Sequence, residues 1–279
     1  MKTWFITGVS SGFGRAIAEA ALAIGDTVIG TLRSEGECAE FSLISPTKSH
    51  GVLLDVTDFA SVVPVVADAE LRFGPIDILV NNAGYGHEGL IEESSLEDVR
   101  RQFDVNVFGA IAVAKAILPG MRQRRSGHII NMTSMGGLTT FPGLGYYHAS
   151  KFALEGFSET LGKEVKDFGV FVTAVEPGAF RTDWAGRSMV RVERSITDYD
   201  ALINPVIERR KAYSGHQPGN PDKAAQVIVD LTRAQDPPAH LLLGKDAWKF
   251  VHEKLDTLHA ELETWRAVTE STDFEVEAA

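Results

Sequence analysis

The stretch GYYHASK, residues 145 to 151, places two adjacent tyrosines ahead of a serine and a lysine. A phenol can exchange a proton with a bound molecule, and a nearby ammonium group favours its phenolate form. A helix turns about 100° per residue, so only positions three or four apart share a face. Tyr147 and Lys151 are four apart, whereas Tyr146 and Lys151 are five apart. If the stretch is helical, its spacing therefore pairs Lys151 with Tyr147 and not with Tyr146.

An isolated Y-x-x-x-K is more often an aromatic core residue beside a solvated lysine. The rest of the chain must therefore show whether this pair is catalytic or structural. Apolar runs of strand length alternate with longer segments of helical period, a pattern typical of a parallel sheet covered on both faces. We expect strands at Thr3 to Thr7, Thr27 to Leu32, Gly51 to Asp55, Ile76 to Asn81, His128 to Met132, Phe171 to Glu176 and Leu241 to Leu243. Helical patterns run through Arg15 to Ile24, Asp58 to Arg72, Leu96 to Arg122, Tyr147 to Asp167 and Asp222 to Arg233.

Seven strands with six intervening helices predict a single α/β domain with a doubly wound, Rossmann-type parallel sheet, spanning residues 1–245. The pattern loosens between Gly178 and Gly219, and we expect residues 179–219 to form a lid over a substrate. After Asp246 an amphipathic helix is expected to about Arg266, followed by a disordered acidic tail within 246–279. Arg187, Arg191 and Arg194 in the lid could grip an anion, although a solvated face is the favoured interpretation.

The first predicted strand leads into TGVSSGFG, residues 7 to 14, and a helix follows. Glycines let the backbone turn tightly and approach a ligand, and the N–H groups that open a helix can bind a pyrophosphate. The same letters contain a rival, because Gly8, Ser10 and Gly12 spell G-x-S-x-G, the nucleophile elbow of a hydrolase. That elbow belongs in the middle of a sheet, and here it ends the first strand, so the hydrolase interpretation is disfavoured.

Four further stretches fit one catalytic apparatus. NNAG closes the fourth strand at Asn81 to Gly84, and Asn106 lies within a helical pattern where an amide has modest propensity. NMTS places Ser134 at a carboxyl edge of the sheet, where doubly wound folds bind ligands. EPG follows the sixth strand at Glu176 to Gly178.

With these residues assembled, the chain resembles the short-chain dehydrogenase/reductase family over roughly residues 1–245. The resemblance rests on TGVSSGFG, NNAG, Asn106, Ser134 and Tyr147-x-x-x-Lys151 in the right order and spacing. It implies a catalytic tetrad of Asn106, Ser134, Tyr147 and Lys151. It implies a dinucleotide site made of Gly8, Ser10, Ser11, Gly12, Phe13, Gly14, Arg33, Asp55, Val56, Asn82, Ala83, Gly84, Tyr147, Lys151, Pro177, Gly178 and Thr182.

In this assignment Tyr147 passes a proton, Ser134 donates a hydrogen bond to the substrate oxygen, and Lys151 also holds the ribose. Asn106 would anchor a water that connects Lys151 to solvent, and Thr182 would hold the nicotinamide amide. Lys151 and the oxidised nicotinamide are both positive, so we expect them to lower the Tyr147 pKa from its usual value near 10. Tyr146 is expected to line or support the pocket.

The second strand ends in TLRSEGE, which bears on the choice of cofactor. An NAD site usually carries an acidic residue at this strand end, whereas Arg33 stands where a base meets a 2′-phosphate in relatives of this kind. NADP(H) is therefore favoured. NAD(H) remains the alternative, because Ser11 replaces a second basic residue of some NADP-preferring relatives and Glu35 and Glu37 lie close by.

An apolar substrate pocket is expected at Tyr85, Met135, Phe141, Leu144 and Trp184, with Leu138 and Met189 as further candidates. Such a pocket suits a ketone or aldehyde of moderate size, or the matching secondary alcohol. The compound, the direction of the reaction and the choice between dimer and tetramer stay open, although a homo-oligomer is expected.

Composition excludes other classes. A net charge of −11 argues against a nucleic-acid partner. A single cysteine, Cys38, and the absence of a signal-peptide pattern suggest a reducing compartment, and we expect the cytoplasm. No apolar stretch reaches the roughly 20 residues that span a bilayer, so no membrane partner is expected. The eight histidines lack metal-type spacing, so no metal is expected and each is interpreted as a surface residue.

Three functions from different classes remain open. They are a dehydrogenase, a serine hydrolase built on Ser10, and a module that senses NADP without turnover. The complete tetrad argues against the sensor, because binding alone requires neither Ser134 nor the phenol of Tyr147.

Overall fold

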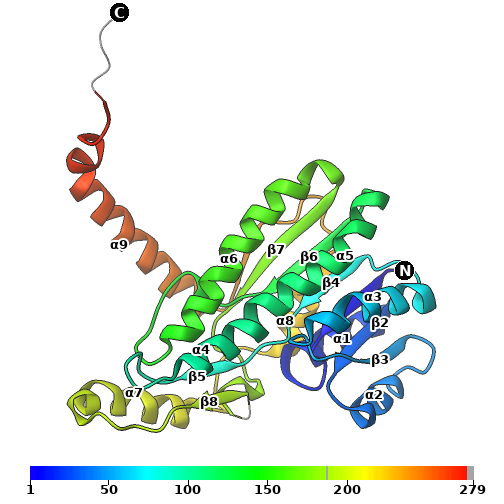
Figure 1. Ribbon diagram of the computed structural model, residues 1–279, viewed down its shortest axis with the longest axis horizontal. Coiled ribbons are helices and arrows are strands. Elements are labelled where there is room, and N and C mark those ends of the chain that lie inside the picture. The colour runs from blue at the N-terminus through cyan, green and yellow to red at the C-terminus, as the bar shows by residue number, and fades with distance from the viewer. Residues whose placement is uncertain (187, 275–279) are drawn as a thin grey trace, which may run out of the picture.

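The computed structural model describes residues 1–186 and 188–274, so Arg187 and the end of the acidic tail lie outside the described residues. One parallel sheet runs through the molecule in the order β3-β2-β1-β4-β6-β7-β9 (Figure 1). Its strands are β1 (Thr3–Thr7), β2 (Thr27–Leu32), β3 (Ser49–Leu53), β4 (Ile78–Asn81), β6 (Gly127–Met132), β7 (Val170–Pro177) and β9 (His240–Leu243). The predicted seven-stranded Rossmann-type sheet is confirmed.

Two layers of helices cover the sheet. One apolar core lies between the sheet and α1 (Gly12–Ala23), α2 (Glu35–Ser42) and α8 (Pro221–Leu231). The other lies beneath α3 (Phe59–Phe73), α5 (Ala110–Arg124) and α6 (Gly145–Val165). Strand residues alternate between the cores, since Trp4 and Ile6 face the first and Phe5 faces the second. A strand buried on both sides reads as a continuous apolar run, which is why these strands could be predicted.

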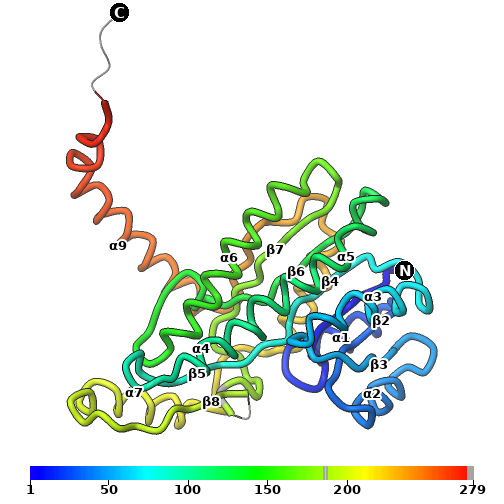
Figure 2. The backbone as a smooth tube through the Cα atoms, in the orientation of Figure 1, coloured from blue at the N-terminus to red at the C-terminus, as the bar shows by residue number. Residues whose placement is uncertain are grey.

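A second, two-stranded sheet joins β5 (Gly86–Glu88) to β8 (Met189–Arg191). Strand β8 and helix α7 (Asp200–Tyr213) make up most of the regular structure of residues 179–219. Strand β5, from an earlier part of the chain, pairs with β8. Figure 2 shows β8 and α7 beside β5 and the start of α4 (Leu96–Phe103), at the end of the molecule opposite α3. The region that lacked a clear pattern is therefore an ordered layer across the strand ends.

Among the described residues, one helical run, Leu96–Arg124, is long and apolar enough to cross a bilayer by length and composition alone. Its inner face, however, includes Val113, Ile117 and Met121, which are buried against the sheet. A core helix passes the same test of length and composition as a membrane span, so this run does not contradict the expectation that no membrane partner is involved.

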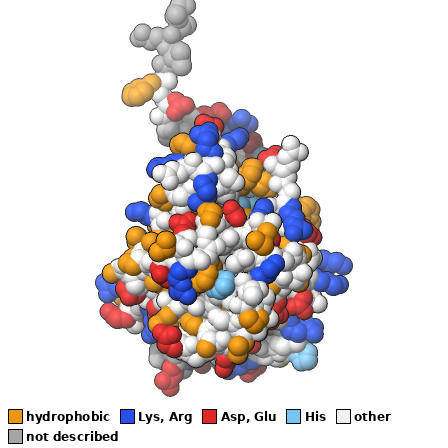
Figure 3. Space-filling model, turned by 90° about the vertical axis from the view of Figure 1, so that its right-hand side faces the viewer, with side chains coloured by type: hydrophobic (Ala, Val, Ile, Leu, Met, Phe, Trp, Pro, Cys, Tyr) orange, Lys and Arg blue, Asp and Glu red, His pale blue; other side chains and the backbone are white. Residues whose placement is uncertain are grey.

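The C-terminal helix α9 (Lys245–Glu270) extends further than the expected end near Arg266 and projects away from the body (Figure 1). Figure 3 shows one face of the molecule, on which acidic and basic side chains are interspersed.

The expectation that every histidine lies on the surface was wrong at three positions. His87, His128 and His148 are each at most 3% exposed.

Candidate active site

A cleft of about 1300 Å³ opens at the carboxyl ends of the strands. It lies where the strand order reverses between β1 and β4, the place at which doubly wound sheets bind ligands. Every residue of the expected dinucleotide site except Gly14 lines it: Gly8, Ser10, Ser11, Gly12, Phe13, Arg33, Asp55, Val56, Asn82, Ala83, Gly84, Tyr147, Lys151, Pro177, Gly178 and Thr182. The cleft is thus continuous from the glycine-rich turn to Tyr147.

The glycine-rich turn is held by its neighbours in a shape that only glycines allow. Gly8 and Gly12 have φ of 73° and 60°, in the left-handed region. A Cβ on Gly14 would lie 2.1 Å from the Gly8 carbonyl oxygen, so Gly14 supports the turn from behind rather than lining the cleft. The Asn82 amide donates to that same Gly8 oxygen at 2.8 Å.

The glycine-rich turn borders the cleft at the start of α1. Helix α1 follows an extended Ser11, and among the described residues no side chain caps its first turn. Uncapped N–H groups at the positive end of a helix are a fitting cradle for phosphate. Ser10 is exposed in the same turn, and within the described part of the chain no hydrogen bond joins it to a histidine. The geometry therefore offers Ser10 a phosphate neighbour and no general base.

Arg33 follows β2 and lines the cleft with an exposed side chain. The Glu37 carboxylate, the rival ligand for the ribose, accepts a hydrogen bond from the Ser34 hydroxyl at 3.0 Å at the start of α2. Burial would raise the pKa of Asp55, but hydrogen bonds from Thr57 and the charge of Arg33 lower it. The Asp55 carboxyl group is therefore ionised, and the Arg33 guanidinium is exposed at the cleft.

Helix α6 brings the pair from GYYHASK to the cleft wall. Tyr147 is only 6% exposed, and the Lys151 Nζ lies 5.8 Å from the centre of its ring. Lys151 Nζ also donates to the Met132 carbonyl at 2.8 Å, which fixes it between α6 and β6. Tyr146 does not line the cleft, and its hydroxyl instead donates to the Ile91 carbonyl at 3.1 Å. The helix therefore presents Tyr147 to the cleft and turns Tyr146 away.

The pKa of Tyr147 is raised in the protein alone, whereas the expected lowering concerned the complex with oxidised nicotinamide. Burial raises it to about 12, and a hydrogen bond with Ser134 lowers it only in part. Burial also lowers the pKa of Lys151 to about 8, against the charge of Glu155. Desolvation outweighs the Ser134 hydrogen bond here, so the phenol is protonated at neutral pH and can donate a proton.

Ser134 lies beside this pair, at the end of β6. Its hydroxyl accepts from the Gly136 N–H at 3.0 Å and lies 3.5 Å from the Pro177 carbonyl oxygen. The first contact makes Ser134 the start of a short 3₁₀ turn, Met135–Gly137, that forms one wall of the cleft. The hydroxyl is thereby fixed close to the phenol.

Asn106 lies behind the cleft in a π-helix, Asp104–Gly109, that joins α4 to α5. Its Oδ1 accepts from the Tyr85 N–H at 3.1 Å, and its Nδ2 donates to the Tyr85 carbonyl at 3.1 Å and to Ser150 Oγ at 3.2 Å. A single π turn in a helix often marks a functional site. Here it moves the amide out of the helix ladder and links the loop after β4 to α6.

The expected substrate-pocket residues Tyr85, Met135, Phe141, Leu144 and Trp184 all line the cleft. The Trp184 ring centre lies 5.1 Å from that of Tyr147. The two further candidates, Leu138 and Met189, do not line the cleft. Met189 instead packs against Leu144 and Tyr147. Residues that the sequence did not single out complete the wall: His148, Val190, Val206, Arg209, Arg210, Tyr213 and Phe250.

His148 is the most informative of the residues that sequence reasoning missed. Its Nδ1 lies 2.8 Å from the Gly136 carbonyl oxygen, and its Nε2 accepts from the Phe141 N–H at 2.9 Å. Burial lowers its pKa, so the ring is neutral and ties both walls of the substrate end to α6. Its position next to Tyr147 in the sequence is the signal that could have identified it as a residue of the cleft wall.

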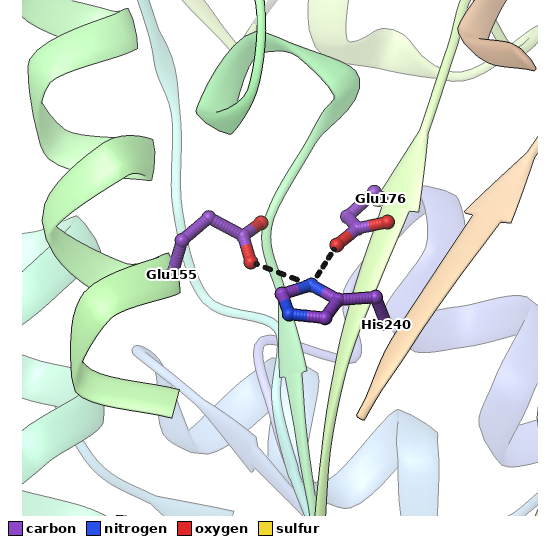
Figure 4. Close-up of side chains that lie close together, drawn as sticks. All are labelled: Glu155, Glu176 and His240. Carbon is purple, nitrogen blue, oxygen red and sulfur yellow. Dashed lines mark hydrogen bonds and ion pairs between the residues drawn. The ribbon is translucent and has the colours of Figure 1, made fainter. Parts of the chain in front are cut away.

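One helical turn beyond Lys151, a cluster of Glu155, Glu176 and His240 joins α6, β7 and β9 (Figure 4). His240 Nδ1 lies 2.7 Å from a Glu176 oxygen and 3.5 Å from a Glu155 oxygen. Burial raises the pKa of both carboxyl groups to about 7. The three groups have metal-ligand chemistry, and their ligand atoms lie within 4.8 Å of one another, which their spacing in the sequence did not reveal.

Comparison with known proteins decides the family. A model described as short chain dehydrogenase matches residues 2–191. The chain belongs to this family. Oxidoreductase BOA17 of Botryotinia fuckeliana is 39% identical over 269 residues, which cover 96% of this chain and 98% of that protein.

Solved structures of short-chain dehydrogenases agree with this assignment. A short-chain dehydrogenase from Streptomyces avermitilis has a TM-score of 0.91 and 41% identity, covering 98% of this chain and all of its own. A serine dehydrogenase complexed with NADP⁺ has a TM-score of 0.74 and 26% identity, covering 86% of this chain and 94% of that chain. As a short-chain dehydrogenase, the protein is an NAD(P)-dependent oxidoreductase of CH–OH or C=O groups.

Proposed function

We propose that the protein is an NADP(H)-preferring reductase or dehydrogenase of a moderately apolar ketone, aldehyde or secondary alcohol, with Tyr147 as its acid and base. The observation that carries this proposal is the position of Tyr147 between the glycine-rich turn and the apolar wall, with Lys151 and Ser134 at its side. NADP(H), when bound, supplies or accepts the hydride.

The remaining groups act on the substrate oxygen and the nucleotide. Ser134 donates a hydrogen bond to the substrate oxygen, and Tyr147 donates a proton to it in reduction or removes one in oxidation. Lys151 holds the ribose hydroxyls, and Asn106 keeps the loop at Tyr85 against α6 while anchoring a water behind Lys151. The raised pKa of Tyr147 keeps its phenol protonated at neutral pH, the form that donates the proton in the reductive direction.

The preference for NADP(H) rests on Arg33. Its guanidinium presents a planar fork of donors that suits a phosphate. No described residue forms an ion pair or a hydrogen bond with it, and it lines the cleft. Glu37 is engaged by Ser34, which weakens the case for an acidic ligand to the ribose. An NAD(H)-preferring alcohol dehydrogenase of the same family is the second candidate, since Glu37 also lines the cleft.

A panel of ketones and aldehydes, offered with NADPH while the absorbance of the reduced nicotinamide is followed, tests the proposal. p-Nitrophenyl esters serve as the control for a hydrolase. We expect NADPH to be consumed with apolar carbonyl compounds, and we expect Ser10→Ala to raise the KM for cofactor modestly without affecting the chemical step. Ester hydrolysis that disappears in Ser10→Ala would instead support the nucleophile elbow.

A further inference from the structure

One helical turn beyond Lys151, two buried carboxyl groups and an imidazole converge on one place (Figure 4). The Glu155 and Glu176 residues, from α6 and β7, are 3% and 0% exposed. His240, from β9, has a side chain that is 39% exposed, so the cluster can be reached from the surface. Each residue offers one ligand atom, and these atoms lie within 4.8 Å of one another. The reaction assigned to the cleft uses none of the three groups.

Most oxygen atoms of the two carboxyl groups lack a hydrogen-bond donor. In the described part of the chain, neither oxygen of Glu155 accepts a hydrogen bond, and the second oxygen of Glu176 accepts none. Thr133 lies close to Glu155, but its hydroxyl donates to the Val175 carbonyl at 2.9 Å. Buried polar atoms are normally paired, and an unpaired one is costly. These oxygens therefore point to a ligand that the chain itself does not supply.

The two carboxyl groups also lack a matching cation. Lys151 is one turn away on α6, but its Nζ donates to the Met132 carbonyl at 2.8 Å. Among residues 1–186 and 188–274, no ion pair joins Lys151 to either carboxyl group. Neighbouring buried carboxylates repel each other unless positive charge lies between them. A single shared proton or a protonated His240 would neutralise one of the two charges, whereas a divalent ion would neutralise both.

We propose that Glu155, Glu176 and His240 bind a divalent transition-metal ion, with zinc as the best fit. Zinc combines imidazole and carboxylate ligands, and where the protein supplies three of them a water completes the tetrahedron. Calcium and magnesium prefer a larger shell made of oxygen atoms, which this cluster does not offer. The site is separate from the reaction in the cleft, so a failure here would leave the proposed activity untouched.

The distances within the cluster suit zinc after one small movement. Ligand atoms about 2.1 Å from a tetrahedral zinc ion lie roughly 3.4 Å from one another. His240 Nδ1 and a Glu155 oxygen are 3.5 Å apart, which already matches. His240 Nδ1 and a Glu176 oxygen are 2.7 Å apart. This hydrogen bond must open by about 0.7 Å, and the ion then takes the place of the proton between the two atoms.

A fourth residue is placed to orient the imidazole. With Nδ1 on the ion, the ring keeps its proton on Nε2, and a Glu159 oxygen lies 3.6 Å from that atom. A carboxylate behind a metal-bound histidine fixes the tautomer and the orientation of the ring. Glu155 and Glu159 are four apart on α6 and share a face. One helix thus supplies both a ligand and the group that positions the histidine.

Zinc binding to the full chain tests the site directly. Protein treated with a chelator and dialysed is titrated with zinc chloride in a calorimeter, and the bound metal is then counted by elemental analysis. We expect one zinc ion per chain, a higher Tm in its presence, and little binding of magnesium at the same concentration. Failure to bind zinc in stoichiometric amount, or equal binding of magnesium, would overturn the proposal.

Substitutions locate the bound ion. His240→Gln should abolish zinc binding, whereas His252→Gln, on an exposed part of α9, is the matched control and should leave it unchanged. Glu159→Gln keeps all three ligands and should weaken binding roughly 10- to 100-fold. Circular dichroism checks folding, and Glu159 is 45% exposed, so its substitution leaves the core intact. Zinc bound equally by His240→Gln and Glu159→Gln as by the unmodified protein, or lost with His252→Gln, would refute this site.

Discussion

The paired tyrosines differ in what surrounds their hydroxyl groups. Tyr147 faces the cleft beside Lys151, whereas Tyr146 donates to a backbone carbonyl outside it. We expect Tyr147→Phe to lower kcat by roughly 10²- to 10⁴-fold, the usual contribution of general acid catalysis. NADPH affinity should be nearly unchanged, because the substitution removes only the hydroxyl. Tyr146→Phe is the matched control, and steady-state kinetics with the two effects exchanged would contradict the assignment.

Arg33 is expected to decide the choice of cofactor. A charge-assisted hydrogen bond contributes on the order of 1.5 to 3 kcal/mol, so Arg33→Ala should weaken NADPH binding roughly 10- to 100-fold. NADH lacks the 2′-phosphate, and its affinity should barely change. Dissociation constants for both cofactors at one fixed salt concentration check this, because salt screens exposed charges. An unmodified protein that already prefers NADH would contradict the account.

The buried carboxyl groups of Glu155 and Glu176 make stability depend on pH. Burial raises their pKa to about 7 in the folded state, above the ordinary value of 4.5, so the folded chain retains protons that the unfolded chain releases. Their contribution to stability is therefore complete below the unfolded pKa and is lost as pH rises through about 7.

Glu155→Gln should remove part of this dependence. We expect the variant to lose less free energy of unfolding than the unmodified protein between about pH 5 and about pH 8. Denaturant titrations at both pH values measure the difference, and the comparison cancels the titration of the buried histidines. An equal or steeper loss in the variant would show that the pair does not titrate in this window.

At the level of elements, the layer over the substrate end depends on one buried carboxylate. Glu88 in β5 lies 3.3 Å from Arg191 in β8 and 2.8 Å from Arg210 in α7, and its side chain is only 4% exposed. Removing one partner of a buried charge pair leaves the others uncompensated. Glu88 therefore holds together two segments that line the cleft.

Glu88→Gln should raise the substrate KM about tenfold, corresponding to a loss of about 1.4 kcal/mol. The dissociation constant of NADPH should stay the same, because the nucleotide end lies on other strands. Glu97→Gln offers a control, since its ion pair with Arg100 is exposed on the surface of α4. Equal effects of both variants on KM, measured in steady state, would argue against a role for the layer in substrate binding.

The elements that sequence could predict are those with a strong burial pattern. All seven strands of the main sheet were found, within two residues at each end. The central ones are continuous apolar runs because they are buried on both faces, whereas the edge strands β3 and β9 are only partly buried. Helix α2 buries only Cys38 and Phe41, and α7 buries only Ile203 and contains Pro205, so neither carries a clear period. The strands β5 and β8 have three residues each, too few for a periodic signal.

The limits within the site have a similar physical cause. The i, i+4 spacing of Tyr147 and Lys151 is local and was visible in the sequence, as was the glycine-rich turn. The contact of Glu155 and Glu176 with His240 depends on how α6, β7 and β9 pack, which no local pattern encodes. The burial that raises the Tyr147 pKa in the protein alone is a property of the folded cleft, so the sequence did not reveal it.

For the whole molecule, the central claim is that hydride moves between the nicotinamide and a carbonyl carbon in this cleft. NADPH carrying deuterium at C4 of the nicotinamide, incubated with a ketone that the panel identifies, tests this claim most directly. Mass spectrometry should find one deuterium on the carbinol carbon of the alcohol, from one of the two C4 faces, and none with Tyr147→Phe over the same time. An alcohol product without deuterium from either face, or no alcohol from any carbonyl compound, would contradict the account.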